Sequence, residues 1–291
     1  MTSERFDRQM RFFGKEGQER IAGSHVAVIG VGGLGSHVVQ QLALLGVGHL
    51  TLLDSEELAL TDLNRLVGAR HDDAIPGTAK VDIGARLVAS INPSMKVETI
   101  RESLVSEAGL AAVIHATHVF GCLDSEGTRL VLNEWCAAYG KPYFDLASDI
   151  IPGNPPTYGG HVCAAWNGDG CLACLGVLDI AEAQEDLAGP KVRADRAALY
   201  GVSQDALERS GPSVVSLNGV VAALAVTEFM VAVTGLRLPN RFMTYYGSTG
   251  KVTVSQDPPH HDCYYCKGIW GRRDQADVMR YLREGVGAYL L

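Results

Sequence analysis

The sequence has 291 residues, of which 47% are hydrophobic, with 25 Lys and Arg against 33 Asp and Glu. This length and apolar content can bury the core of one large domain or two small ones, and we expect one. The acidic balance argues against a nucleic-acid partner, because phosphates favour a basic face. The polar residues from Met1 to Gln9 lack the apolar core of a secretory signal, so we expect a cytoplasmic protein.

The first half of the chain shows strand-like and helix-like segments in alternation. We expect strands at His25–Ile29, His49–Leu53, Val113–Phe120 and Pro142–Leu146, and helices at Ser36–Leu45, Val81–Ile91 and Gly127–Ala138. Strands that alternate with helices predict a doubly wound, mostly parallel, Rossmann-like α/β sheet.

The second half departs from this pattern. A Gly- and Pro-rich stretch at Ile151–Gly170 contains a further expected strand, Tyr158–Ala165. The charged, Ala-rich segment Asp179–Gly211 suits a surface excursion or a crossover loop. Alternation over Arg241–Val254 predicts two strands joined at Gly247–Gly250. These strands predict an antiparallel extension of the sheet.

The segment Val214–Val233 is apolar and nearly long enough to span a bilayer. Its polar interruptions are Ser216, Asn218, Thr227 and Glu228. Because a charge inside a membrane span costs a few kcal/mol, we expect a buried core or interface helix and no membrane association.

A glycine-rich turn separates the first strand from the first helix of this alternation. Its glycines are Gly30, Gly32, Gly33 and Gly35. Backbone N–H groups at such a turn, together with the helix dipole, can face a phosphate or a ribose. Asp54 ends the next strand, where its carboxylate can accept ribose hydroxyls. These features fit a nicotinamide dehydrogenase as well as an ATP-dependent enzyme.

Charged residues downstream favour ATP. Arg65 closes the polar run that begins at Thr61, and Lys80 precedes an expected helix. Two cations suit a triphosphate better than a nicotinamide. Asp124 follows the end of an expected strand, where one carboxylate can hold Mg²⁺ against phosphate oxygens.

The chain has seven cysteines, an odd number that is unlike a secreted disulfide framework. Four of them form two Cys-x-x-Cys pairs, Cys171 with Cys174 and Cys263 with Cys266. This spacing predicts a structural, tetrahedral Zn²⁺ site that ties two distant segments together. Buried free cysteines or redox pairs are the alternatives, and the neighbouring His260 and His261 are interpreted as loop residues.

Taken together, the motifs resemble those of the ubiquitin-activating-enzyme-like superfamily, in its bacterial MoeB/ThiF-type adenylyltransferase branch. The residues that carry the resemblance are Arg5-Phe6-Asp7-Arg8-Gln9, Gly30 to Gly35, Asp54, Asp62-Leu63-Asn64-Arg65, Lys80, Ile91-Asn92-Pro93, Asp124 and the two Cys-x-x-Cys pairs. The resemblance implies one adenylation domain over residues 1–291. Its parts would be an N-terminal helical segment (1–23), a nucleotide-binding half (24–150) and a half for partner binding, crossover loop and zinc (151–291).

The resemblance also implies a reaction and roles for residues. A C-terminal glycine carboxylate of a ubiquitin-like, β-grasp protein ending in Gly-Gly would attack ATP, giving an acyl-adenylate and pyrophosphate. Arg65 and Lys80 would neutralise phosphate charge, Asp124 would hold Mg²⁺, and Arg8 would reach the γ-phosphate from the other subunit of a homodimer. The remaining nucleotide contacts would come from Gly30, Gly32, Gly33, Gly35, Asp54, Thr61, Asp62, Leu63, Asn64 and Ser125.

The chain departs from many relatives in having no cysteine between Cys174 and Cys263. We therefore expect no crossover-loop thioester, and handover of the acyl group to a separate thiol or sulfur-transfer partner. Cys122, Cys136 and Cys163 are interpreted as packing residues, with Cys163 the first to test as an unconventional nucleophile.

Three alternatives stay open from the sequence. The substrate carboxylate could belong to a peptide or a small molecule instead of a ubiquitin-like protein. The glycine turn and Asp54 would also serve an NAD-dependent oxidoreductase. A third possibility is a non-catalytic partner subunit, against which the presence of Arg65, Lys80 and Asp124 argues.

Overall fold

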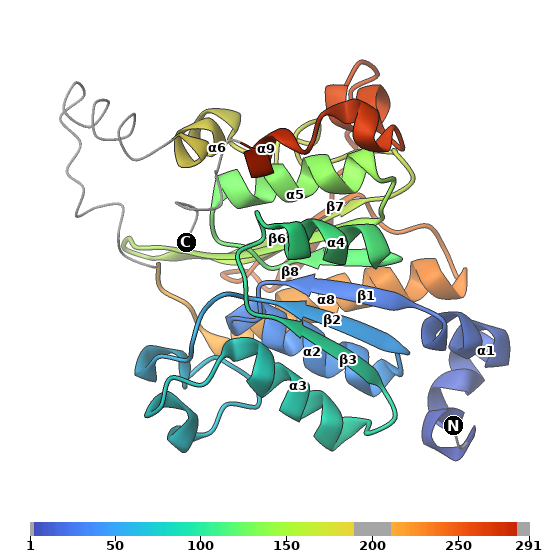
Figure 1. The fold of residues 1–291 in the computed structure, drawn as a ribbon, viewed down its shortest axis with the longest axis vertical. Helices are drawn as coiled ribbons and strands as arrows, with labels where there is room; N and C mark the ends of the chain where they lie inside the picture. The colour runs from blue at the N-terminus through green and yellow to red at the C-terminus, as the bar shows by residue number, and fades with distance from the viewer. Residues whose placement is uncertain (1–2, 189–210, 284–291) are drawn as a thin grey trace.

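A single mixed sheet organises the protein, in a computed structural model that describes residues 3–188 and 211–283. Within these residues the sheet has eight strands in the order β3-β2-β1-β4-β5-β6-β7-β8 (Figure 1). The five strands from β3 to β5 pair in parallel, and β6, β7 and β8 pair antiparallel. The strands are β1 (His25–Ile29), β2 (His49–Leu53), β3 (Lys96–Ile100), β4 (His118–Gly121), β5 (Tyr143–Ile151), β6 (Thr157–Ala165), β7 (Phe242–Tyr246) and β8 (Lys251–Val254).

Helices cover both faces of the sheet (Figure 1). One layer holds α2, α3 and α8, with α1 packed against α8, and the other holds α4, α5 and α6. The helices are α1 (Asp7–Ala22), α2 (Gly33–Leu45), α3 (Lys80–Ile91), α4 (Glu107–His115), α5 (Glu126–Ala138), α6 (Ile180–Leu187), α8 (Val215–Thr234) and the short α9 (Arg280–Arg283). The expected doubly wound fold with an N-terminal helix and an antiparallel extension is confirmed.

Two apolar clusters, one on each face, form the core. In β1, Val26 and Val28 point into the cluster with α8, while Ala27 and Ile29 point into the cluster with α5. The alternation follows from the period of two along a strand, and both faces are apolar because helices cover both. Trp135 of α5 is fully buried, and its indole N–H donates to the carbonyl of Val278 at 3.2 Å.

Helix α8 is the one helix of the described residues that is long and apolar enough to cross a membrane. It packs instead against α2, β5 and β6. Glu228 on this helix is 2% exposed and accepts from both terminal nitrogens of Arg237, at 2.6 and 2.7 Å. The paired carboxylate and the contacts with the sheet support the interpretation as a core helix.

Several expected elements match the structure, and one does not. The strands His25–Ile29 and His49–Leu53 have the predicted bounds. The strand expected at Val113–Phe120 is wrong over its first part, because α4 continues to His115 before β4 begins. Ser106 initiates that helix by accepting from the N–H of Gly109 at 3.0 Å.

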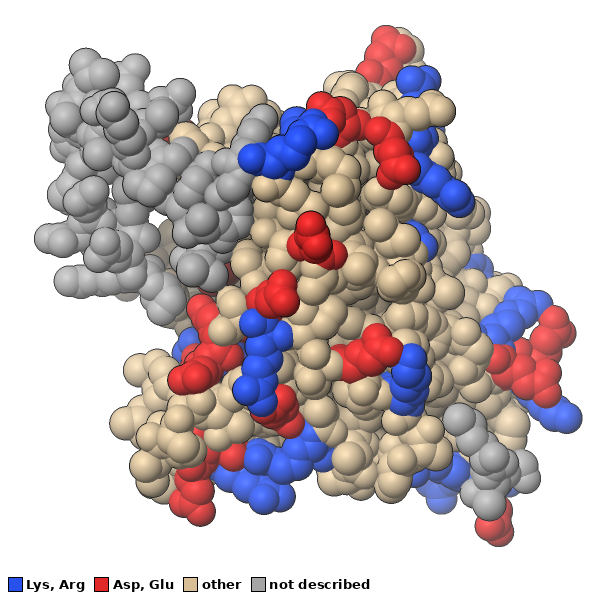
Figure 2. Space-filling model, viewed as in Figure 1, with Lys and Arg blue, Asp and Glu red and all other residues tan. Residues whose placement is uncertain are grey.

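Within the segment expected to be a surface excursion, the structure has a helix, α6, and residues 189–210 lie outside the described part of the chain. The predicted division of the chain at residue 150 falls near the end of β5 and stays a prediction. On the face seen in Figure 2, basic and acidic side chains are interspersed, without a broad basic patch among the residues coloured there.

Candidate active site

The glycine turn lies at the carboxyl end of β1, where α2 begins. Gly30 has φ +87°, a conformation that favours glycine, and a side chain there would also meet the carbonyl of Cys122 at 2.5 Å. A side chain on Gly35 would lie 1.9 Å from the carbonyl oxygen of Gly30. No side chain caps the first N–H groups of α2, whose N-cap is Gly32. These amides are therefore a suitable cradle for an anion.

Asp54 follows β2 and fixes the glycine turn from beside it. Its carboxylate accepts from the N–H of Val31 at 2.7 Å and from the N–H of Glu56 at 2.9 Å. Burial raises the pKa of Asp54, because desolvation disfavours the carboxylate, while these two N–H groups oppose the shift. The sequence predicted that Asp54 contacts a ribose; the structure places it next to the turn, and the ribose contact stays a prediction.

Arg65 and Lys80, the two cations that the sequence analysis expected near a triphosphate, lie close together beside the turn. Arg65 Nη2 lies 2.6 Å from Asp62 Oδ1, and Lys80 Nζ lies 3.6 Å from Asp62 Oδ2. Lys80 Nζ also forms an ion pair with Glu56, whose side chain is 65% exposed. Burial alone would lower the pKa of Lys80, but the carboxylates of Glu56, Asp54 and Asp62 outweigh it and raise that pKa.

The other residues of the polar run differ in exposure. Thr61 and Asn64 are exposed, Leu63 is half-buried, and Asp62 is buried at 6% exposure. Asp62 also accepts from the N–H of Ala59 at 3.1 Å. Asp62 therefore lies between two cations, and its structural role is to hold them side by side.

Asp124 and Ser125 lie between the end of β4 and the start of α5. Asp124 is exposed, and among the described residues no hydrogen bond or ion pair engages its carboxylate. Ser125 caps α5 by accepting from the N–H of Thr128, and it donates to Asp186 Oδ2 at 2.9 Å. An exposed carboxylate without a partner fits a magnesium ion that is bound mainly by phosphate oxygens and water.

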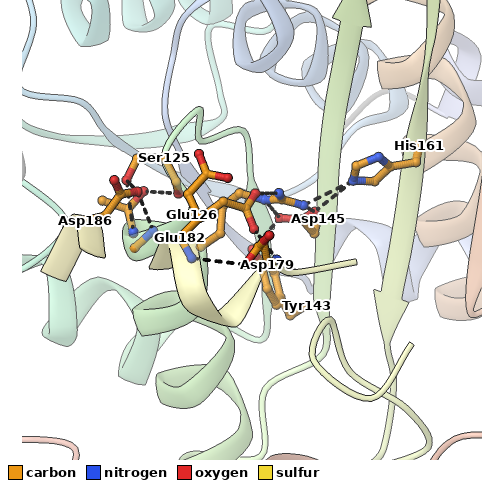
Figure 3. A network of polar contacts seen from close by, with 11 residues as sticks. Ser125, Glu126, Tyr143, Asp145, His161, Asp179, Glu182 and Asp186 are labelled. Atoms are coloured by element: carbon orange, nitrogen blue, oxygen red, sulfur yellow. Dashed lines mark hydrogen bonds and ion pairs between the residues drawn. The ribbon is translucent and has the colours of Figure 1, made fainter. Parts of the chain in front are cut away.

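A polar network fastens α6 across the start of α5 (Figure 3). Asp186 Oδ2 accepts from the N–H of Gly127 at 2.9 Å, and the N–H of Asp179 donates to Glu126 Oε2 at 2.8 Å. Neighbouring carboxylates crowd this helix, and burial together with Glu126 and Asp186 raises the pKa of Glu182. The start of the predicted excursion is thus fixed beside Asp124.

Beneath this region lies a buried charge pair that the sequence analysis did not find. Arg129 Nη2 lies 2.5 Å from Asp145 Oδ2, and the hydroxyl of Tyr143 donates to Asp145 Oδ1 at 2.8 Å. Burial alone would raise the pKa of Asp145, but Arg129 and His161 lower it to about 2. The available signal was a single acid, Asp145, inside an apolar strand; the pairing with Arg129 needs the tertiary structure.

Arg8 is not brought to the glycine turn within one chain. Its helix, α1, leads into the amino end of β1, and Gln9 on the same helix donates to the carbonyl of Leu45 at 2.8 Å, at the far end of α2. The turn lies at the opposite edge of the sheet. Arg8 of the same chain therefore lies remote from Arg65 and Lys80.

The four predicted ligand cysteines form one cluster. Cys171 Sγ lies 3.6 Å from Cys263 Sγ, Cys174 Sγ lies 3.7 Å from Cys266 Sγ, and all four sulfurs lie within 4.8 Å of one another. Thiolates bound to tetrahedral zinc at about 2.3 Å are about 3.8 Å apart, whereas disulfide sulfurs are about 2.05 Å apart. The spacing fits a zinc ion and not two disulfides.

The other three cysteines pack in the interior. Cys136 and Cys163 are at most 2% exposed, and Cys122 is half-buried. Burial raises the pKa of each of these thiols above its ordinary value. Because the thiolate is the nucleophile, this environment argues against Cys163 as an attacking group.

Comparison with known proteins identifies the family. The family model described as "ThiF family" matches residues 6–267. This chain belongs to the ThiF family. Molybdopterin-synthase adenylyltransferase of Escherichia coli (strain K12) is 35% identical over 178 residues, which are 60% of this chain and 68% of that protein. The superfamily inferred from the sequence motifs is confirmed.

Other relatives extend the comparison. The heterocyst protein HesA of Trichormus variabilis is 35% identical over 59% of this chain and 62% of its own length. The SAMP-activating enzyme E1 of Haloferax volcanii is 35% identical over 49% of this chain and 55% of its own. The matched part is thus about two thirds of these relatives or less.

Solved structures confirm the fold. Escherichia coli MccB with MccA-N7isoASN superimposes with a TM-score of 0.71 at 20% identity, over 92% of this chain and 75% of that one. PaaA superimposes with a TM-score of 0.63 at 21% identity, over 87% of this chain and 82% of that one. At such identities the likeness concerns the fold alone. Relatives of this chain in Escherichia coli and Salmonella typhimurium are named adenylyltransferases, so the enzyme class expected from the sequence is confirmed.

Proposed function

We propose that this ThiF-family chain is an adenylyltransferase that activates the C-terminal glycine carboxylate of a ubiquitin-like protein with ATP. The observation that carries the proposal is the pair of cations, Arg65 and Lys80, held by Asp62 beside the glycine turn. Family membership and the names of the relatives, which include an adenylyltransferase and a SAMP-activating enzyme, support it.

The carboxylate of Glu56, which is paired with Lys80, occupies a position suited to a phosphate oxygen. Glu56 is mostly exposed, so it can leave Lys80 at small cost when a phosphate takes its place. Lys80 itself is buried at 6% exposure, which keeps its ammonium fixed and strengthens its field at the site. Preorganised cations of this kind stabilise the charge that develops on a phosphorus centre during attack.

In the proposed step, a carboxylate oxygen of the substrate forms a bond to the α-phosphorus of ATP. The bond from that phosphorus to the bridging oxygen breaks, and pyrophosphate leaves with the electron pair. No base need remove a proton, because a carboxylate with a pKa of about 3.5 is already ionised at neutral pH. Asp124 would hold Mg²⁺, which neutralises charge on the leaving group when bound.

A second copy of the chain would complete the site. Arg8 lies on α1 at the opposite edge of the sheet from the glycine turn, so we propose that a homodimer supplies it in trans. Mixing Arg8→Ala and Lys80→Ala chains tests this. Each variant alone should be inactive, whereas the mixture should regain part of the activity, because one site of a mixed dimer keeps both residues. A mixture as inactive as its components would contradict the arrangement.

The acyl group would pass to a separate thiol or sulfur-transfer partner. No cysteine occurs between Cys174 and Cys263, and of the three remaining cysteines Cys136 and Cys163 are buried and Cys122 is half-buried. The four-cysteine cluster would hold a structural zinc ion, since a closed set of four thiolates leaves no open position for catalysis.

The deciding measurement is exchange of labelled pyrophosphate into ATP. We expect exchange that depends on a β-grasp protein ending in Gly-Gly and disappears when its last glycine is removed. Exchange supported only by a peptide or by a small carboxylic acid would move the substrate to that class. Tight NADH binding without ATP binding would replace adenylation by an oxidoreductase function.

A further inference from the structure

A buried amide contacts the glycine turn from the side of α8. Asn218 lies in the first turn of α8 and is 1% exposed. Its Oδ1 accepts from the hydroxyl of Ser148 on β5 at 2.7 Å, and its Nδ2 donates to the hydroxyl of Ser213 at 3.1 Å. Both ends of the amide are therefore fixed by hydrogen bonds, which determine its orientation.

The same amide faces Gly33, the first residue of α2. A Cβ atom built on Gly33 would lie 2.5 Å from Asn218 Nδ2 and 3.2 Å from Arg65 Cδ. Because residue 33 is a glycine, the amide of Asn218 and the aliphatic stem of Arg65 can both lie close to its Cα atom. Asp62 holds the other end of Arg65 through its guanidinium.

We infer that Asn218 is a positioning residue for the phosphate-binding end of Arg65 and for the start of α2. The inference rests on the proposed function and adds to it a residue from the second half of the chain. Ser148 and Ser213 fix the amide, the amide packs over Gly33, and the Arg65 stem lies against the same glycine. The uncapped N–H groups of α2 and the guanidinium are thereby held in one arrangement.

A negative charge at position 218 should be felt by the nucleotide. Asn218→Asp keeps the size of the side chain and its bond from Ser148, but it places a carboxylate beside the turn where phosphate would bind. Like charges a few ångströms apart repel strongly away from bulk water. A residue that served only the folding of α8 would show a loss of stability without a selective effect on ATP.

The experiment compares Asn218→Asp with Asn240→Asp in the full-length protein. Asn240 lies beyond the other end of α8, and its Nδ2 donates to Glu228 at 3.3 Å, so its replacement also puts a new carboxylate into a polar contact of this helix. ATP affinity is measured directly by displacement of a fluorescent ATP analogue, and activity by pyrophosphate exchange.

We expect Asn218→Asp to raise Kd and KM for ATP by more than about tenfold, with a smaller change in kcat. Asn240→Asp should lower Tm but leave both ATP constants within about twofold of the wild type. Equal effects of the two variants on ATP affinity at equal loss of Tm would overturn the inference.

A rescue experiment isolates the contact itself. Gly33→Ala should weaken ATP binding, because the added methyl group meets the amide of Asn218. The double variant Gly33→Ala, Asn218→Ser should bind ATP more tightly than Gly33→Ala alone, since the shorter side chain makes room. No recovery would show that the amide is not what Gly33 accommodates.

The outcomes separate the two proposals. A wild-type protein that binds no ATP overturns the proposed function, and the positioning role with it. A wild-type protein that exchanges pyrophosphate normally, while Asn218→Asp binds ATP with unchanged affinity, overturns only the role of Asn218.

Discussion

The four-cysteine cluster differs from the edge of the sheet that carries the glycine turn, Arg65, Lys80 and Asp124 in how completely one chain builds it. We call this edge, where the proposed function places ATP, the nucleotide edge. The cluster brings four sulfurs within 4.8 Å of one another, and each of the two printed sulfur contacts joins cysteines that are 92 positions apart in the sequence. At the nucleotide edge, Arg65 and Lys80 are paired with carboxylates, Asp124 is exposed, and Arg8 lies at the other edge of the sheet.

This difference agrees with a structural role for the cluster and a chemical role for the nucleotide edge. Four thiolates complete the coordination of a zinc ion and leave no position for a substrate. Such a site contributes to the stability of the fold. A cation that is paired with an exposed carboxylate, as Lys80 is with Glu56, can exchange that partner for a substrate. Loss of the cluster should therefore mainly unfold the protein, and loss of Asp124 should mainly stop the reaction.

The largest expected effect is at the cluster. Cys171→Ser should abolish stoichiometric zinc and lower the free energy of unfolding by about 4 kcal/mol or more, because a ligand of a structural metal is lost. Metal analysis and denaturant unfolding measure the two. Cys136→Ala, a buried cysteine outside the cluster, is the control and should retain zinc. Full stability of metal-free Cys171→Ser would remove the structural role.

Next comes the buried pair beneath the nucleotide edge. Asp145→Asn should cost about 3 kcal/mol, because Arg129 keeps its charge in the interior and retains only Glu126 of its two carboxylate partners. Asp145 has its pKa lowered to about 2, so its stabilisation is complete above the unfolded value of about 4 and is lost as pH falls through about 2. The free energy of unfolding of the variant should therefore lack the decrease that Asp145 causes in the wild type as pH falls from about 4 to about 2. A variant with the same pH dependence as the wild type would contradict this prediction.

Substitution of Asp124 should change activity strongly and stability little. Asp124→Asn should reduce pyrophosphate exchange by about a hundredfold or more, because the proposed function gives Asp124 the role of holding the ion that neutralises the leaving group. Its Tm should stay within about 2 °C of the wild type, since the side chain is exposed and has no partner among the described residues. Undiminished exchange would refute the assigned metal role.

The smallest effect is expected at a histidine pair remote from both regions. His25 and His49 stack at 3.6 Å between ring centroids, at the amino ends of β1 and β2. Burial lowers the pKa of each ring, and their mutual repulsion lowers that of His25 further. A lowered histidine pKa gives stability above the unfolded value of about 6.5 that is lost as pH falls below it.

His49→Phe should flatten this dependence in thermal unfolding between about pH 5 and 7, while pyrophosphate exchange at pH 8 stays close to that of the wild type. A variant with the same slope as the wild type would exclude the pair as its source.

The sequence predicted much of the parallel half, because apolar runs and glycine turns are local signals. The strand β1 and the loop to α2 follow from such a run and its turn. β3 was not predicted, since its residues Lys96 and Glu98 are exposed and its apolar pattern is weak. The misassigned start of β4 has the opposite origin, because the end of the helix α4 is as apolar as a strand.

The candidate site was predictable only where its residues belong to ordered motifs. Arg65, Lys80 and the four cysteines were found and do come together in pairs or as a cluster. Asn218 was noticed only as an interruption of an apolar run. Its contact with Gly33 joins residues far apart in the sequence, and no local periodicity encodes such a contact.

Hydrogen bonds fix the described chain on both sides of residues 189–210. On one side, Asp186 is bonded to the start of α5 beside Asp124; on the other, Ser213 is bonded to Asn218 beside Gly33. Both borders of the described chain thus contact the elements that follow β1 and β4 at their carboxyl ends, one through Asn218 to the start of α2 and the other directly to the start of α5.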